Sequence, residues 1–438
     1  MSARTQERRR VERLLWRAGF GGTPAQISRL SRGGATAAVE KLLRPKGPAL
    51  KGRPPKVDGL PLDPLNAYGH DVLWWLDRAV RGQHPLVERM TLNWHDHFAT
   101  SNNEVGDVKL MIAQYWTLRR FALGRFRSLA KAITKDHAMQ RFLNLSNSEK
   151  GAPNENFARE LLELFTLGVN NGYTERDVRE AARALTGFTY DWESKRFGYD
   201  PAKHDTGMKR ILGRRGNFAP LDVVDIAIDH PNHAPFICRK LWDYFIPRPI
   251  PPTALRTLVR AYRRSGTDVR PVLREILNHK AFYAGLDEPD MVKPPFVYLA
   301  GMLRRSGKSI TDEQWVWRLD QMGQVPFHPP NVSGWEGGVS WLSTSSIRAR
   351  FDAASAVLRK AIEDGSVSRK ETPAQAIARA RLATGTMWVS NRTANAMKRY
   401  AVQSVAGRTD EWEVKHFYPE RQRVLRHILL AGPDAQVC

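Results

Sequence analysis

Cysteine is scarce in this chain of 438 residues, which contains two, Cys238 and Cys438. Because they lie far apart and no Cys-x-x-Cys pair occurs, we expect neither a disulfide framework nor a thiolate zinc site. Long apolar runs are also missing: no uncharged stretch approaches the roughly 20 residues that a membrane-spanning helix needs. We therefore expect no transmembrane span.

The N-terminus lacks the pattern of a signal peptide. After the basic run Arg8–Arg10, the only apolar stretch is Leu14–Trp16, and Arg17 ends it before a hydrophobic segment develops. Taken alone, the sequence predicts a soluble cytoplasmic protein.

Several familiar catalytic motifs are absent. The sequence has no Gly-x-x-x-x-Gly-Lys-Ser/Thr loop, no dinucleotide-binding glycine fingerprint, no Gly-x-Ser-x-Gly elbow and no His-Glu-x-x-His. These absences exclude most of the common nucleotide-binding and hydrolase sites.

Positive charge is the strongest feature of the composition, with a formal net charge of +23. Such a charge favours anionic partners, among them nucleic acid, membrane headgroups and acidic polysaccharide. The basic residues are scattered, however, and short clusters such as Arg304–Arg305 usually lie on solvated helix faces. An arginine-rich proteome explains the charge equally well. We therefore keep an anionic or glycan ligand as a candidate partner and do not expect specific nucleic-acid binding.

The hydrophobic pattern predicts a mainly α fold: one large multi-helix domain with long loops and at most a small β element. Thr174–Asp177 resembles a capping box with aspartate in the usual place of glutamate. Residues 188–217 interrupt the helical pattern and hold either a hairpin or a long functional loop. The predicted helices include Thr5–Arg17, Ala67–Arg81, Leu86–Phe98, Lys109–Leu123, Phe126–Ile133, Leu221–Asp229 and Ala234–Phe245.

The same pattern suggests four segments along the chain. They are N-terminal helices, an excursion rich in proline, glycine and lysine, a helical core that carries the motifs, and C-terminal helices packed on the same domain: 1–43, 44–64, 65–360 and 361–438.

A helix predicted over residues 154–168 carries three polar side chains beside its apolar face. At ~100° per residue, Glu160 lies about 40° from Leu164, with Asn156 and Glu163 close by. An amphipathic helix with ordinary ion pairs explains much of this pattern. It explains Glu160 less well, because a carboxylate that faces a core needs a partner or a shifted pKa.

Two histidines, His95 and His97, lie at the end of the predicted helix over residues 86–98. On a helix the side chains of a His-x-His pair diverge by about 160°. The pattern therefore predicts that His97 faces inward and His95 the opposite side. A hydrogen-bonded core histidine is one interpretation of His97, and a metal or catalytic role is the other.

Two loops add further candidates. His204, Asp205 and Lys209 form a polar cluster in irregular chain, where functional sites are common, although a plain surface loop is the alternative. The loop over residues 327–341 is rich in proline and glycine. Its Trp335 either stacks on a sugar or a base or plugs the loop onto the core.

These motifs, in this order, resemble the bacterial family catalogued as domain of unknown function 1800. The similar strings begin at Leu14–Gly21 and end at Leu429–Pro433, so the resemblance covers nearly the whole chain. The string from Asn154 to Gly168 is long enough to be quite specific. Other matching strings are Trp94–Phe98, Tyr173–Val178, Ala184–Phe188, Lys240–Trp242 and Pro329–Trp335.

The resemblance implies a largely helical fold without an assigned reaction, so no catalytic residue can be carried over. It also implies an exported or envelope protein, in contrast to the missing signal peptide, and a neighbour-encoded partner that resembles sulfatases and alkaline phosphatases. Three hypotheses follow. The first is a hydrolase-like enzyme that uses carboxylate and histidine side chains on a polymeric or glycan substrate. The second is a non-catalytic envelope or scaffold protein that acts with the phosphatase/sulfatase-like partner, and the third is a non-specific nucleic-acid binder.

For the enzyme, we expect the candidate residues to converge in one pocket. The predicted catalytic groups are Glu160, Glu163, His97, His204 and Asp205, and the predicted substrate-binding groups are Asn156, Lys209 and Trp335. Such a pocket would perform general acid–base chemistry or hold a divalent metal through His97 and Glu160.

Overall fold

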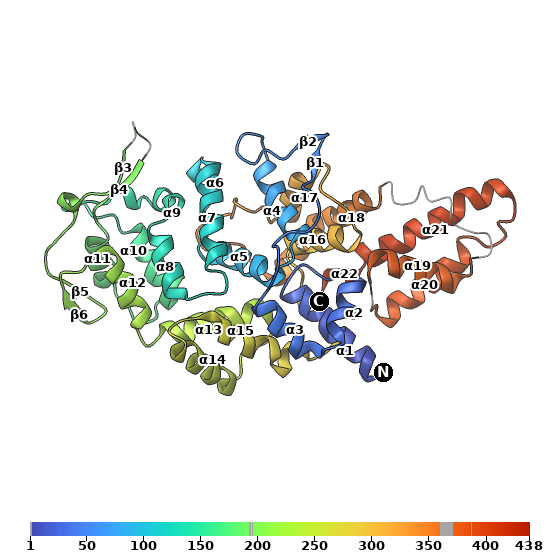
Figure 1. Ribbon diagram of the computed structural model, residues 1–438, viewed down its shortest axis with the longest axis horizontal. Helices are drawn as coiled ribbons and strands as arrows, with labels where there is room; N and C mark the ends of the chain where they lie inside the picture. Colours follow the sequence, from blue (N-terminus) through green and yellow to red (C-terminus); the bar gives the residue numbers. More distant parts are fainter. Residues whose placement is uncertain (1, 192–193, 195, 360–370, 387) are drawn as a thin grey trace. The chain divides into compact units, whose positions relative to one another are not determined.

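The computed structural model of the chain (Figure 1) describes residues 2–191, 194, 196–359, 371–386 and 388–438. The chain divides into two compact units, which we call unit 1 and unit 2. Unit 1 comprises Met1–Leu86, Asn278–Val325 and Glu336–Cys438, and unit 2 comprises Val87–Leu277 and Pro326–Trp335. The ends of the sequence thus belong to the same unit, and the predicted core over residues 65–360 is shared between both units.

The fold is mainly α, as predicted. In the described part of the chain, strands occur only in three two-stranded antiparallel hairpins. The first hairpin lies in the predicted excursion, and the other two fill residues 188–217, where a hairpin and a long loop were the alternatives. The pairs are β1(Lys56–Val57) with β2(Leu60–Pro61), β3(Phe188–Asp191) with β4(Arg196–Tyr199), and β5(Lys209–Ile211) with β6(Arg214–Gly216).

Unit 1 is built from helices of both chain ends. Thr23 caps the start of one of them: its hydroxyl accepts a hydrogen bond from the backbone N–H of Gln26, and Pro24 occupies the first helical position. The elements are α1(Ala3–Arg17), α2(Pro24–Ser31), α3(Gly34–Leu43), α4(His70–Arg81), η4(Lys280–Tyr283), α16(Pro295–Arg305), α17(Gln314–Met322), η5(Gly338–Leu342), α18(Thr344–Leu358), α19(Pro373–Thr384), α20(Asn391–Gln403), α21(Glu411–Ala431) and α22(Pro433–Gln436).

Helices α19, α20 and α21 lie side by side at the red end of Figure 1. Small side chains such as Ala376 and Ala380 let them pack closely around Met397 and Leu425, which are fully buried. This three-helix layer brings the end of the chain back to the N-terminal helices of the same unit.

Unit 2 follows the sequence more continuously. Its α11 opens with the predicted capping box, in which Thr174 and Asp177 hydrogen-bond reciprocally. The elements are α5(Pro85–His97), α6(Asn102–Val105), α7(Val108–Arg120), α8(Phe126–Thr134), α9(His137–Phe142), η1(Leu145–Asn147), α10(Asn156–Glu160), η2(Leu161–Leu167), α11(Glu175–Ala184), η3(Pro201–Lys203), α12(Pro220–Asp229), α13(His233–Phe245), α14(Pro252–Arg264) and α15(Val269–Asn278).

The segment predicted as one α-helix over residues 154–168 is different. It begins as α10 and continues as the π-helix η2 from Leu161 to Leu167. A π-helix has a wider turn than an α-helix, so side-chain positions after Glu160 depart from the helical wheel used for the prediction. The other predicted helices occur, with ends displaced by no more than three residues.

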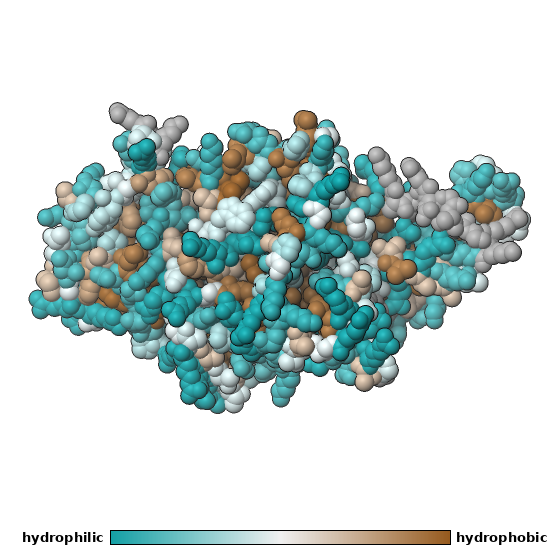
Figure 2. Space-filling view, in the orientation of Figure 1, coloured by the Kyte–Doolittle hydropathy of each residue, from teal (hydrophilic) through white to brown (hydrophobic). Residues whose placement is uncertain are grey.

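Among the helices in the described part of the chain, none has the length and apolar character needed to cross a bilayer. Figure 2 shows a largely hydrophilic face on which hydrophobic residues are scattered. Exposed apolar residues distributed in this way are ordinary for a folded surface.

Candidate functional site

The last turn of α5 and one side of α13 form a cavity of about 190 Å³ in unit 2. Spacings of three and four residues bring the lining residues of each helix to one side of that helix. The polar residues of the lining are Asn93, Asp96 and His97 from α5 and Lys240, Asp243 and Tyr244 from α13. Two carboxyl groups, an amine, an imidazole, an amide and a phenol therefore share one small space.

Asp96 is the most perturbed acid of this cavity. Its Oδ1 accepts a hydrogen bond from the backbone N–H of Trp335 at 2.8 Å. Burial raises the pKa of Asp96 to about 6, because the loss of water outweighs that hydrogen bond and the opposite charge of Lys240. Asp96 therefore gains and loses its proton close to neutral pH.

Gly334 allows the loop of residues 326–335 to reach Asp96. Its φ is +85°, a conformation that favours glycine, and a Cβ atom built on it would collide with both the carboxylate and the carbonyl oxygen of Asp96. Because the backbone of Gly334 comes so close to Asp96, the N–H of Trp335 reaches the carboxylate.

The residues from α13 complete the polar lining. Lys240 is exposed along part of its length, but desolvation of its ammonium group lowers its pKa, and the nearby Asp96 only partly opposes this effect. Desolvation also raises the pKa of Asp243, against the opposing charge of Arg239. Burial raises the pKa of Tyr244 to about 12, so its hydroxyl stays protonated. The acids and the lysine are thus all shifted towards their neutral forms.

His97 lines the cavity, and its role in the fold is clear. Its Nε2 donates a hydrogen bond to the carbonyl oxygen of Phe165 at 3.1 Å, and burial holds its pKa well below the usual value. His233 does the same one residue further on: its Nδ1 donates to the carbonyl of Thr166 at 2.8 Å. Since the last carbonyls of a helix lack partners within it, these neutral histidines cap the π-helix. His97 is thus a buried, hydrogen-bonded histidine, and a metal or catalytic role for it stays a prediction.

The prediction that His95 faces the opposite side, away from the interior, is wrong. His95 is almost completely buried, and its Nε2 accepts a hydrogen bond from the backbone N–H of Phe327 at 3.1 Å. Its ring also packs against Trp335, with a centroid distance of 5.5 Å. The loop of residues 326–335 covers the side of α5 that the helix pattern had assigned to solvent.

The carboxylates of the 154–168 segment lie elsewhere. Glu163 accepts a hydrogen bond from the hydroxyl of Tyr173 at 2.9 Å, and Asn156 is exposed. Desolvation, reinforced by the charge of Glu163, raises the pKa of Glu160, whereas Arg159 opposes the rise. The expected shift of Glu160 is thus present, although neither glutamate lines the cavity.

The cluster from the 200–209 loop fastens its hairpin to α11. His204 donates from Nδ1 to the carbonyl of Thr186 at 3.0 Å. Asp205 forms an ion pair with Arg183 at 2.8 Å, which holds the pKa of Asp205 below its usual value. The Lys209 amine is buried and donates to the carbonyls of Asp205 and Gly207. All three side chains therefore have structural partners within the loop, in α11 or at Thr186 just after that helix.

The predicted residues consequently form several separate groups of contacts. Among them, His97 lines the cavity, and Trp335 contacts it through its backbone N–H on Asp96. Their catalytic and binding roles remain predictions. Sequence reasoning did not select Asp96, Lys240 or Asp243, although the strings Trp94–Phe98 and Lys240–Trp242 contain two of them. The polar residues beside the histidine were the available signal.

The described residues contain no group of three or more histidine, cysteine, aspartate or glutamate side chains arranged to hold a metal ion. The predicted metal candidates His97 and Glu160 were not found in such a group.

The family described as "Protein of unknown function (DUF1800)" matches residues 13–437. Neither the curated proteins nor the solved structures gave a match. With nearly its whole length matched, the chain belongs to the DUF1800 family of proteins of unknown function.

Proposed function

We propose that the chain is a hydrolase-like enzyme that acts on a glycan or a similar hydroxyl-rich polymer in the cavity between α5 and α13. One observation carries the proposal: Asp96 and Asp243, two carboxyl groups with raised pKa values, line the same cavity as Lys240. Pairs of carboxyl groups with adjusted pKa values are the usual equipment for hydrolysis of glycosidic bonds.

In the proposed reaction, Asp96 is the general acid. Its protonated carboxyl group gives its proton to the leaving oxygen as the carbon–oxygen bond of the substrate breaks. Asp243, which is solvent-exposed, takes a proton from a water molecule, and the oxygen of that water forms the new bond to carbon. Exchange with solvent then returns the proton of Asp243 to bulk water and reprotonates Asp96, so one water is consumed for each bond cleaved.

The dimensions and the lining support a sugar-sized group. A cavity of about 190 Å³ has room for roughly 13 to 19 water-sized atoms, enough for the dozen or so heavy atoms of one hexose. Asn93 and Lys240 supply hydrogen-bond donors for hydroxyl groups. Trp335 is half-buried and packs against His95, so part of its ring remains open for contact with a neighbouring sugar.

The positive charge gives weaker support to a nucleic-acid function. Part of that charge is inside the fold, since a set of arginines is almost completely buried and contacts carbonyl groups, aromatic rings or carboxylates: Arg9, Arg13, Arg17, Arg89, Arg350 and Arg421. A scaffold role beside a phosphatase/sulfatase-like partner is the outcome that a failed enzyme test would favour.

The test is a screen of the purified protein against neutral, acidic and sulfated polysaccharides, with release of reducing ends as the readout. The active substrate is then compared across Asp96→Asn, Asp243→Asn and the exposed unit 1 control Asp320→Asn. We expect the first two variants to lose about 10²- to 10⁴-fold in kcat/KM and the control to keep its rate. Because the acid must be protonated, the wild-type rate should fall as pH rises above about 6. Full activity in both cavity variants would refute the proposal.

A further inference from the structure

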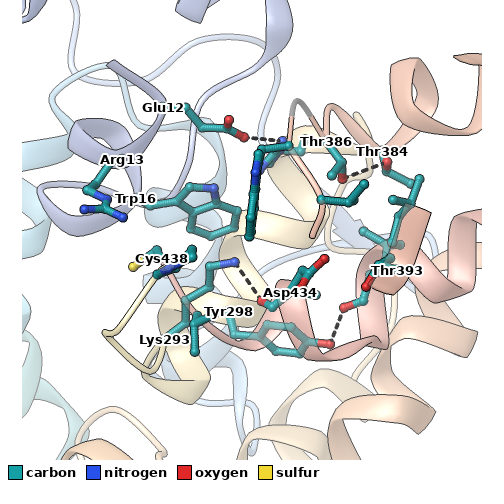
Figure 3. A pocket seen from close by; sticks show the side chains of 18 of the residues that line it. Glu12, Arg13, Trp16, Lys293, Tyr298, Thr384, Thr386, Thr393, Asp434 and Cys438 are labelled. Atoms are coloured by element: carbon teal, nitrogen blue, oxygen red, sulfur yellow. Dashed lines mark hydrogen bonds and ion pairs between the residues drawn. The ribbon is translucent and has the colours of Figure 1, made fainter. Parts of the chain in front are cut away.

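A second cavity, of about 90 Å³, lies within unit 1 (Figure 3). Its wall is formed by α1, by α16 and the chain just before it, and by residues between Thr384 and Cys438. Trp16 lies across the middle of this wall, with Lys293 and Tyr298 below it in the view. Nothing in the proposed reaction uses these residues.

The cavity is strongly basic. Four cationic side chains line it, and both carboxylates of the lining are already engaged. Glu12 pairs with Arg305 at 3.1 Å, and Asp434 accepts a hydrogen bond from the backbone N–H of Ser390 at 2.7 Å. The main-chain oxygen of Cys438, which also belongs to the lining, accepts a hydrogen bond from the guanidinium group of Arg17. The four cations are Arg9, Arg13, Lys293 and Arg305.

Lys293 carries spare hydrogen-bonding capacity. Its side chain is buried, and its ammonium group donates to the carbonyl oxygen of Ala435 at 2.7 Å and lies 4.0 Å from the centre of the Trp16 ring. No carboxylate of the described residues lies within ion-pair distance of it. An ammonium group has three N–H donors, so two remain for a ligand. Desolvation lowers the pKa of Lys293 to about 8.

Arg305 adds a second donor on the same aromatic ring. Its side chain is 7% exposed, and its guanidinium group lies 5.2 Å from the Trp16 ring centre. One nitrogen binds Glu12, but Nε is buried without a hydrogen-bond partner. Leaving a buried charged donor unsatisfied is costly, and a bound acceptor would remove that cost.

We propose that this cavity binds a tetrahedral oxyanion, a phosphate or sulfate group, through Lys293 Nζ and Arg305 Nε. Its volume of about 90 Å³ has room for roughly six to nine waters, enough for a group of five heavy atoms and too little for a nucleotide. The Thr386 hydroxyl lies 3.0 Å from the Thr384 hydroxyl and also lines the cavity (Figure 3). Charged donors to such oxygens form the strongest hydrogen bonds available to a protein.

The experiment uses the full-length protein with sodium phosphate, sulfate, acetate and chloride at equal ionic strength. Isothermal titration calorimetry gives the affinity, and thermal unfolding gives an independent readout. We expect phosphate or sulfate to raise the Tm by about 2 °C or more at tenfold excess over Kd, and acetate and chloride to have smaller effects. Equal responses to all four salts would show a bulk ionic effect and overturn the proposal. A response to only one of phosphate and sulfate would identify the source of the group.

Variants locate the binding. Lys293→Met keeps the aliphatic stem over Trp16 and removes the charge, and Arg305→Lys keeps the charge and removes Nε. We expect each to weaken the oxyanion by at least about tenfold, while the exposed Lys398→Met in the same unit binds as the wild type does. If Lys293→Met unfolds, Arg305→Lys alone decides. Wild-type affinity in Arg305→Lys would refute the site. Glycan hydrolysis is read separately, so failure here leaves the proposed function standing.

Discussion

The two cavities differ in how they offset the desolvation cost of their buried ionisable groups. In unit 1 the buried arginines and Lys293 are held against carbonyl oxygens, carboxylates and the faces of aromatic rings. In unit 2 burial instead shifts Asp96 and the histidines towards their neutral forms. The desolvation penalty is the same in kind: in the unit 1 cavity polar partners and aromatic rings offset it, and in the unit 2 cavity the groups shift towards their neutral forms.

The largest expected effect concerns pairing in unit 1. Arg421 is fully buried and forms a 2.8 Å ion pair with Glu371, so Arg421→Leu leaves a buried carboxylate without that partner. We expect a loss of about 3–5 kcal/mol in the free energy of unfolding, measured by chemical denaturation. Arg423→Leu on the same helix is the control, because its pair with Glu420 is exposed and should contribute under about 1 kcal/mol. Similar losses in both variants would show that burial does not decide how much these ion pairs contribute to stability.

The next largest loss of stability is expected at the loop contact that shields Asp96 from water. Gly334→Ala forces a Cβ atom onto the Asp96 carboxylate at a positive φ, and we expect a loss of about 2–3 kcal/mol. Gly337→Ala, where nothing lies within 4 Å, should change stability by less than about 0.5 kcal/mol. If the loop separates, the pKa of Asp96 should also fall towards that of an ordinary aspartate, which NMR titration of its carboxyl carbon would detect. An unchanged pKa of Asp96 would contradict this account.

A smaller effect concerns neutral histidine in unit 2. Burial lowers the pKa of His233 to about 4, below that of an unfolded histidine. Between about pH 6.5 and pH 4 the unfolded chain therefore binds a proton that the folded chain does not, and stability falls as pH decreases. From pH 7 to pH 5 this group should cost about 2 kcal/mol. Asp96 and Asp136, whose pKa values are raised to about 6, act in the opposite direction.

The comparison that isolates His233 is the wild type against His233→Gln, unfolded by denaturant at pH 7 and at pH 5. The variant will be less stable at both values, because it loses the contacts to Thr166 and Tyr262. Its deficit should shrink by about 2 kcal/mol at pH 5. The exposed His416→Gln should show no such change. A constant deficit would mean that His233 is not neutralised by burial.

The smallest effect is a gain. Because Asp96 has a raised pKa in the folded state, its contribution to stability is lost as pH rises through about 6. Asp96→Asn keeps the shape and the acceptor for the Trp335 N–H, and should stabilise the protein at pH 8 by roughly 1–2 kcal/mol after allowance for partial solvation. Asp320→Asn should not. An equal or lower stability in Asp96→Asn would argue that burial does not oppose ionisation of this acid.

Sequence reasoning succeeded where structure depends on near neighbours. The Thr174–Asp177 capping box and most helix ends are decided within one or two turns of chain. It failed where distant segments meet. His95 was assigned to the outside because the loop that buries it comes more than 200 residues later, 232 residues along the chain at Phe327. Arg305 was assigned to a solvated face for the same reason, since Glu12 and Trp16 lie at the other end of the sequence.

The candidate site shows the same limit. A helical wheel correctly placed His97 towards the interior, but it could not show that α13 supplies Lys240 and Asp243 to the same cavity. It also assumed an α-helix through residues 161–167, where the chain forms a π-helix. Nothing in the local residue pattern distinguishes these two helices, and the imidazoles that cap two of the final carbonyls come from other segments of the chain.

That capped π-helix also has a consequence for amide hydrogen exchange. The carbonyls of Phe165 and Thr166 accept hydrogen bonds from His97 and His233, on helices α5 and α13, and the last carbonyl, of Leu167, accepts one from the side-chain amide of Asn171. Opening this turn therefore requires the hydrogen bonds from both imidazoles to break together. Protonation of either imidazole ring would favour its exposure to water and so weaken its hydrogen bond to the turn. We expect the amides of these seven residues to exchange slowly at neutral pH and to open at a rate that increases steeply in mild acid. Their exchange would then report on the stability of the contacts that the π-helix makes with α5 and α13.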